Sequence, residues 1–169
     1  AQGNYGRIRM SDIDQKLEAV RKLEAIWKQK EVPVIFLKER KGRPMIKAGD
    51  GEKDTVWIRD FGSSYGGSWQ QKYNCWVVPK AWFTGITKKL LSIYGRVYVV
   101  QPFSENEKCC PACWNATGIE CTCSCQGANH GSGQPAGKWY IVSDTFAAKR
   151  GDRHYGCKLI TPFFETDIF

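Results

Sequence analysis

The sequence predicts an α+β domain with a mixed or antiparallel sheet and two main helices. Short apolar runs rich in β-branched and aromatic residues recur along the chain, whereas only two segments repeat apolar residues at helical spacing. Six of the eight cysteines fall within 17 residues, inside a segment near residues 108–131 that interrupts the predicted strands. With 169 residues, 42% of them hydrophobic, the chain is long enough to bury a core without crosslinks.

The first helix is predicted over residues 11–30. Ser11 is a favourable N-cap, and Asp14 three residues later completes a capping box. Apolar side chains recur every three or four residues and form one stripe, which we expect to face the core: Ile13, Leu17, Val20, Leu23 and Trp27. We interpret residues 1–10 as a tail or a remnant of cloning, because Met10 is a natural starting residue.

Strands and a second helix follow. Residues 32–37 and 44–47 are expected to pair around the basic turn 39–43. Further strands are predicted at residues 55–58, 75–79, 97–100, 138–142 and 155–160, with a Gly- and Ser-rich loop over 61–71. The second helix is predicted over 82–94, because Gly95 stands where a helix C-terminal glycine belongs. We expect one domain over residues 11–169, with 108–131 as an insertion.

The cysteine-rich segment has the composition of a zinc knuckle. Zinc takes four thiolate or imidazole ligands at tetrahedral corners, and two short ligand-bearing turns can supply them. The pair Cys110 and Cys113 has knuckle spacing, and the second cysteine group follows within a dozen residues. The candidate ligands are Cys109, Cys110, Cys113, Cys121, Cys123, Cys125 and His130. Because they outnumber the four places on one ion, two zinc ions with bridging thiolates remain an alternative, as does an iron–sulfur cluster.

A disulfide framework is the rival interpretation, since eight cysteines could pair and Asn115 begins a glycosylation sequon. Cysteines two residues apart in an extended chain have Cα atoms roughly 6.6 Å apart, near the limit for a bridge. Their partners would have to be Cys75 and Cys157, which we expect to be buried free thiols. We therefore predict a cytoplasmic protein with an unglycosylated Asn115, and no apolar run approaches the ~18 residues of a membrane span.

Charge and aromatic content suggest a nucleic-acid partner. The net charge is +8, and residues 1–48 hold most of it, with 12 basic against 6 acidic side chains. We expect Arg40, Lys41 and Arg43 to contact phosphates. Aromatic residues interleaved with cations crowd the region 57–83, where we expect Tyr65 and Trp69 to be exposed and to stack on bases, with Lys72 beside them. DNA is favoured over RNA.

The stretch from Trp57 to Tyr98 resembles the HARP-type domain of annealing helicases. The likeness is a strand, a Tyr- and Trp-bearing strand from Tyr73 to Val78, and a helix beginning at Trp82. It covers a quarter of the chain, does not include the cysteine-rich segment, and implies binding to branched or single-stranded DNA.

Two other functions stay open at this point. One is a nuclease-like enzyme that uses His130 and His154, with polar neighbours between Asp144 and Arg153, although the alternative for that segment is a charged loop between two strands. The other is a protein-interaction module or a disulfide-rich secreted domain. We assign no catalytic residue.

Overall fold

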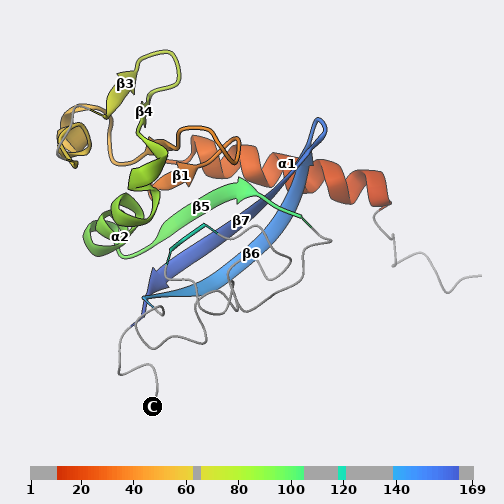
Figure 1. Cartoon of the computed structure of the whole chain (residues 1–169). Helices are drawn as coiled ribbons and strands as arrows, with labels where there is room; N and C mark the ends of the chain where they lie inside the picture. The colour runs from red at the N-terminus through yellow and green to blue at the C-terminus, as the bar shows by residue number, and fades with distance from the viewer. Residues whose placement is uncertain (1–10, 63–65, 105–117, 121–138, 164–169) are drawn as a thin grey trace, which may run out of the picture.

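A computed structural model describes residues 11–62, 66–104, 118–120 and 139–163. Within these ranges the protein is a mixed α+β fold with a seven-stranded sheet and two α-helices, which confirms the predicted class (Figure 1). The strand order is β3-β4-β2-β1-β5-β7-β6. Of the predicted insertion over 108–131, only Gly118, Ile119 and Glu120 belong to the described residues.

The strands vary in length from the short edge at β3 to the long β6–β7 hairpin. Their bounds are β1 Val34–Phe36, β2 Met45–Lys47, β3 Ser68–Gln70, β4 Cys75–Val77, β5 Val97–Pro102, β6 Tyr140–Arg150 and β7 Arg153–Pro162. Neighbouring strands run antiparallel except β1 and β5, which pair in parallel with Val34 opposite Tyr98. Alternate side chains of each strand therefore face opposite sides of the sheet.

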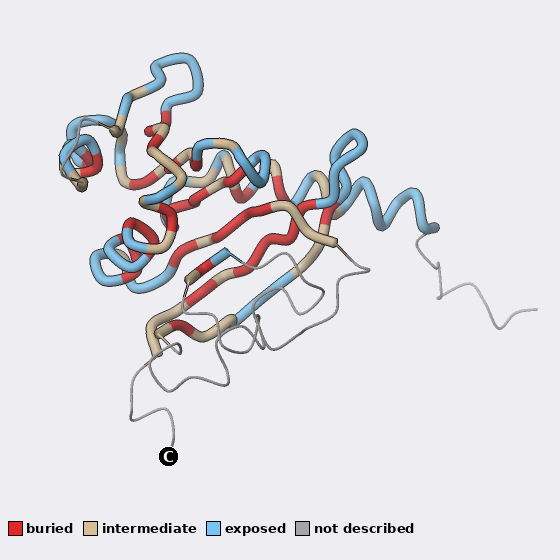
Figure 2. Tube along the Cα trace, viewed as in Figure 1, coloured by how far each residue is buried: buried red, intermediate tan, exposed pale blue. Residues whose placement is uncertain are grey.

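Helix α1, Asp12–Lys28, lies on one side of the sheet, and we call that side the α1 face. The Ser11 side chain accepts a hydrogen bond from the Asp14 backbone N–H, so the predicted cap is confirmed. The expectation that the whole apolar stripe is core is wrong for its first half. Ile13 is 70% exposed and Leu17 is 48% exposed, because the start of α1 projects beyond the sheet (Figures 1 and 2).

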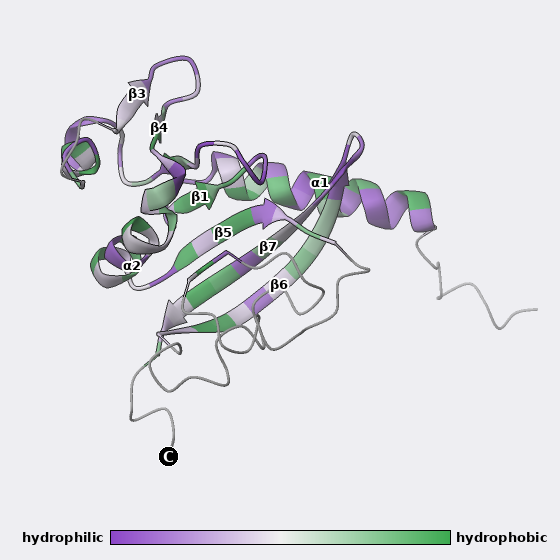
Figure 3. Cartoon of the chain, viewed as in Figure 1, coloured by the Kyte–Doolittle hydropathy of each residue, from purple (hydrophilic) through white to green (hydrophobic). Residues whose placement is uncertain are grey.

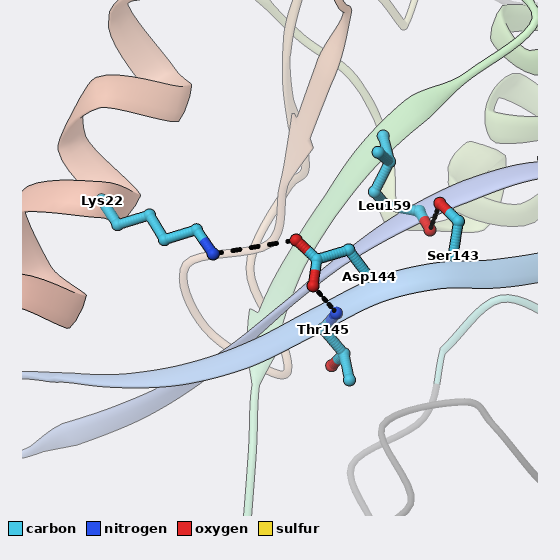
Figure 4. Close-up of polar contacts among 5 residues, drawn as sticks. All are labelled: Lys22, Ser143, Asp144, Thr145 and Leu159. Atoms are coloured by element: carbon cyan, nitrogen blue, oxygen red, sulfur yellow. Dashed lines mark hydrogen bonds and ion pairs between the residues drawn. The ribbon is translucent and has the colours of Figure 1, made fainter.

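The second half of α1 is fastened to β6 (Figure 4). The Lys22 ammonium lies 3.7 Å from an Asp144 carboxylate oxygen and 4.4 Å from the centroid of the Phe146 ring. An irregularity in the β6–β7 ladder falls between Val142 and Asp144, and the Ser143 hydroxyl there donates to the Leu159 carbonyl at 3.1 Å. A bulge re-aims the side chains that follow it, and both Asp144 and Phe146 lie beside Lys22 of α1.

Helix α2, Phe83–Tyr94, covers the opposite side, the α2 face. It follows the 3-10 turn η2, Lys80–Trp82, and ends at Gly95, whose φ of 80° is a left-handed conformation that glycine adopts without strain. The predicted C-terminus is therefore confirmed. Its apolar stripe packs on sheet residues that are almost wholly buried: Ile35, Ile46, Val97, Val99 and Ile160.

The strand predicted at residues 55–58 is wrong. The segment Lys53–Ile58 forms the 3-10 helix η1. Thr55 and Ile58 are buried whereas Val56 is 39% exposed, so burial follows a three-residue spacing rather than strand alternation. The Thr55 hydroxyl accepts from the buried Trp76 indole N–H at 2.6 Å and donates to the Gly51 carbonyl at 2.8 Å. The bond from Trp76, which is distant in the sequence, holds the turn against the core of the α2 face.

Candidate nucleic-acid interface

The basic turn between β1 and β2 is held firmly at one end of the sheet. Arg40, Lys41 and Arg43 are exposed there, as predicted. The Lys80 ammonium donates to the Arg40 carbonyl, and the Val78 backbone N–H donates to the Pro44 carbonyl at 3.0 Å. The turn therefore offers charged side chains on a backbone fixed by its neighbours.

A second basic turn lies beside it, at the tip of the β6–β7 hairpin (Figure 3). Arg150 pairs with Arg153 across a two-residue turn that begins at Gly151, whose φ is 63°. An Arg153 guanidinium nitrogen lies 3.2 Å from a Glu39 carboxylate oxygen and also donates to the Lys38 carbonyl at 3.2 Å. The predicted charged loop is thus mostly strand, and Arg153 joins the two turns.

An open cleft of about 710 Å³ lies on the α1 face beside these turns. One wall is the second half of α1, including Trp27, and the floor comes from β1, β2, β5 and β7. The rings of Trp27 and Phe36 are 6.0 Å apart, and those of Phe36 and Tyr155 are 5.3 Å apart in an edge-to-face contact. Tyr73, on the β3–β4 turn, also lines the cleft and is 54% exposed.

The side chains around the cleft give it a positive rim. The charged residues that line it are the cations Lys28, Lys38, Arg150 and Arg153 and the acids Glu24 and Asp152. The floor is apolar, with Val34, Met45 and Val100 among its members. An apolar, aromatic surface bordered by cations suits a planar ligand that carries negative charge.

Lys47 fixes the position of Trp27 in the wall. Its ammonium donates to the Trp27 carbonyl at 2.8 Å, in the last turn of α1, and lies 5.5 Å from the centroid of the indole ring. A cation at a helix C-terminus satisfies carbonyls that have no partner within the helix. Burial lowers the pKa of Lys47, as does the nearby Lys30 ammonium, and the buried thiol of Cys75 opposes the shift. Lys47 therefore has a structural role.

Of the two aromatic residues predicted to stack on bases, the structure describes only Trp69. Trp69, in β3, is half-buried rather than exposed, because its ring packs edge-to-face on Trp76 at 5.5 Å in the core of the α2 face. Its indole N–H donates to the Gln71 side chain at 3.0 Å. The Lys72 ammonium lies 5.3 Å from the ring of Tyr73. Tyr65 lies outside the described residues, so the stacking role of Tyr65 and Trp69 stays a prediction.

The seven predicted zinc ligands and Asn115 all lie outside the described residues. The tripeptide between the two cysteine groups is described and is well anchored. Ile119 is fully buried, its backbone N–H donates to the Thr84 hydroxyl at 3.1 Å, and its carbonyl accepts from the Lys158 ammonium at 3.2 Å. Glu120 lies 3.1 Å from the Lys80 ammonium. Within the described ranges, no three His, Cys, Asp or Glu side chains form a group that could hold a metal.

The two cysteines predicted to be buried free thiols are confirmed as such. Cys75 is fully buried and Cys157 is 1% exposed. Burial raises the pKa of Cys75 to about 11, against a lowering by the Lys47 ammonium, and burial raises the pKa of Cys157 to about 12. Both thiols therefore stay protonated and unreactive at neutral pH.

His154, the described member of the histidine pair proposed for a nuclease site, is exposed on β7, opposite Lys149. The other member, His130, lies outside the described residues, so that pairing stays a prediction. The residues that build the cleft escaped the sequence analysis as a group, because Tyr155 lies far along the chain from Trp27 and Phe36. Only the helical spacing of Trp27 marked one of them, and it indicated core.

Among the helices that the structure describes, none is long and apolar enough to cross a membrane. Compared with known proteins, the chain matches no family model, no curated protein and no solved structure. In the stretch that resembles the HARP-type domain, the first element is the 3-10 helix η1 and not the strand that the likeness requires.

Proposed function

We propose that this protein is a nucleic-acid-binding module, stabilised by a structural zinc, whose two neighbouring basic turns hold phosphates. The observation that carries the proposal is the meeting of the β1–β2 turn with the tip of the β6–β7 hairpin. Their exposed cations are Lys38, Arg40, Lys41, Arg43 and Arg150. A positive cluster on a fixed backbone attracts a polyanion, and binding then has to order only the side chains of the cluster.

The contacts between the turns support this proposal over a diffuse solvated surface. Arg153 is engaged by Glu39 and by the Lys38 carbonyl, so it positions the two turns relative to each other. The Tyr155 hydroxyl donates to the same Lys38 carbonyl at 3.0 Å. The two turns therefore present their charge in a fixed relative position. The proposal assigns no catalytic residue, and it favours DNA over RNA.

The zinc part of the proposal rests on the cysteine spacing and on the anchor between the two groups. Ile119 is buried and lies between the two cysteine groups in the sequence. A metal crosslink between these groups would therefore stabilise the folded position of Ile119. We propose that thiolates from 109–113 and 121–125, with His130 as a further candidate, supply that crosslink to about one zinc per chain. Elemental analysis of the purified protein tests this, and strong chelation should lower its thermal midpoint. Metal-free protein with intact disulfides would refute it.

The phosphate contacts are tested by a charge variant with a matched control. Replacing Arg40, Lys41 and Arg43 with Gln removes three charges from the basic turn. Replacing Lys53, Lys89 and Arg96 with Gln removes the same charge from exposed sites elsewhere. Anisotropy titrations with a labelled oligonucleotide across a salt series should show the slope of log K against log salt falling by roughly 0.7 per lost contact for a single strand and 0.9 for a duplex.

The control variant should leave that slope nearly unchanged. Equal losses in both variants would show that only net charge matters, and the turns would have no special role. Failure of the wild type to bind any DNA or RNA at low salt would overturn the proposal altogether.

A further inference from the structure

We infer that the cleft on the α1 face is a pocket for an unpaired nucleobase, so that the protein prefers single strands to duplexes. This inference rests on the proposed function and deepens it, because it names the form of nucleic acid that the site takes. The cleft volume of about 710 Å³ falls within the roughly 300–1,000 Å³ that ligand pockets occupy. A base in a duplex is stacked on both faces and paired along one edge, so only an unpaired base can enter such a cleft.

The aromatic residues of the cleft suit a base. Tyr73 is 54% exposed, on a turn that borders the cleft, and offers a ring to solvent. Trp27 is half-buried in the opposite element, α1, with its backbone held by Lys47. Aromatic rings bind bases of any sequence, because every base has a π-face. Phe36 and Tyr155 complete the ring cluster behind them.

The rim distinguishes a nucleotide from a purely apolar partner. Four cations and two acids line the cleft, and the cations come from α1, the β1–β2 turn, β6 and β7. An apolar peptide would gain nothing from such a rim, whereas phosphates on either side of an inserted base would be neutralised by it. Lys38 and Arg153 belong both to this rim and to the basic turns, so a strand held at the turns continues directly into the cleft.

The experiment compares three ligands of matched length: a single strand, its duplex, and a single strand with abasic sites in place of its bases. Two cleft variants are used, Tyr73→Ala and Trp27→Leu, with Tyr73→Phe to keep the ring. Trp57→Leu is the control, because Trp57 is half-buried against the core of the α2 face. Circular dichroism and the urea midpoint verify that each variant folds.

Each cleft variant should weaken single-strand binding by about 5- to 150-fold, the equivalent of the roughly 1–3 kcal/mol that a stacked base contributes. Duplex binding should change by less than about twofold, and Tyr73→Phe should bind like the wild type. The abasic strand should bind the wild type more weakly than the normal strand, and should not distinguish the wild type from Tyr73→Ala.

Four outcomes would overturn the inference. If the wild type binds single strand and duplex equally while the turn variant is still defective, the proposed function stands and the cleft has no part in it. Cleft variants no weaker than Trp57→Leu, or an abasic strand that binds like the normal one, would also exclude a base in the cleft. Binding of neither ligand by the wild type would overturn the proposed function and this inference together.

Discussion

The two faces of the sheet are covered in different ways. The α2 face is closed by α2, η1 and Ile119 over an aliphatic core in which many side chains have no exposed area. The α1 face is covered by one helix that packs on β6 and the strands beside it, and the cleft opens over β1 and β2. The α2 face therefore has the larger buried core, whereas the α1 face keeps an open cleft lined by aromatic side chains.

The same strands serve both faces. In β1, Ile35 belongs to the core of the α2 face, while Val34 and Phe36 face α1. The α1-face cluster includes Trp27, Phe36, Tyr98 and Phe146, which are only partly buried, and two of these rings have a cation close by: Lys22 at Phe146 and Lys47 at Trp27. Partly buried aromatic residues also border the α2 face, but there they pack against a larger buried core of mostly aliphatic side chains.

The largest expected change in the free energy of unfolding comes from a substitution on the α2 face. Replacing Leu90 of α2, which is fully buried, with Ala should lower the free energy of unfolding by about 2–5 kcal/mol, because the lost side chain leaves a cavity. The matched change on the α1 face is Met45→Ala in the half-buried floor of the cleft. Solvent can fill the space there, so the free energy of unfolding should fall by less. Urea unfolding measures both. Equal losses would mean that the two faces contribute alike.

The ends of the two helices could be predicted well from the sequence, because local signals define them. Ser11 and Gly95 mark helix ends through their own backbone and side-chain chemistry. A strand was wrongly predicted at Thr55–Ile58, because Val, Trp and Ile favour strands. The hydrogen bond from the distant Trp76 to Thr55 holds the segment as a turn, and no local pattern predicts that bond.

The cleft on the α1 face could not be predicted from local signals. The parallel register that places Val34 opposite Tyr98 joins segments more than sixty residues apart, and no local pattern specifies it. The cleft exists because that register brings Phe36 close to Tyr155 and because α1 covers only part of the sheet. The apolar spacing of α1 gave no sign that Ile13 and Leu17 would project beyond the sheet edge.

A second prediction asks whether the covered part of the α1 face is sealed as tightly as the α2 face. Burial raises the pKa of Cys157 to about 12, from an ordinary value of 9.0. Below pH 9 the thiol is protonated in both states and its contribution is complete. Between pH 9 and 12 only the unfolded chain loses the proton, so the free energy of unfolding falls as the pH rises.

The measurement is the difference in pH dependence between the wild type and Cys157→Ala. From pH 9 to pH 10 the wild type should lose about 1 kcal/mol more than the variant, because one thiol contributes up to 1.36 kcal/mol per pH unit. Parallel pH curves for the two proteins would show that the thiol is reached by solvent, and that this part of the face is open as well.

The smallest expected effect concerns the polar contact that fastens α1 to β6 (Figure 4). The Lys22 and Asp144 side chains are 50% and 57% exposed, and ion pairs of this kind contribute roughly 0.2–1 kcal/mol.

Lys22→Met keeps the aliphatic contact with Phe146 and removes both the ion pair and the cation over the ring. Asp144→Asn removes only the ion pair and retains an oxygen for the Thr145 N–H. Both should cost less than about 1 kcal/mol in urea unfolding, with Lys22→Met the larger, and high salt should reduce the cost of Asp144→Asn further. A loss of several kcal/mol from either change would mean that charge holds α1 in place, and the apolar contacts of Leu23 and Ile26 would then be secondary.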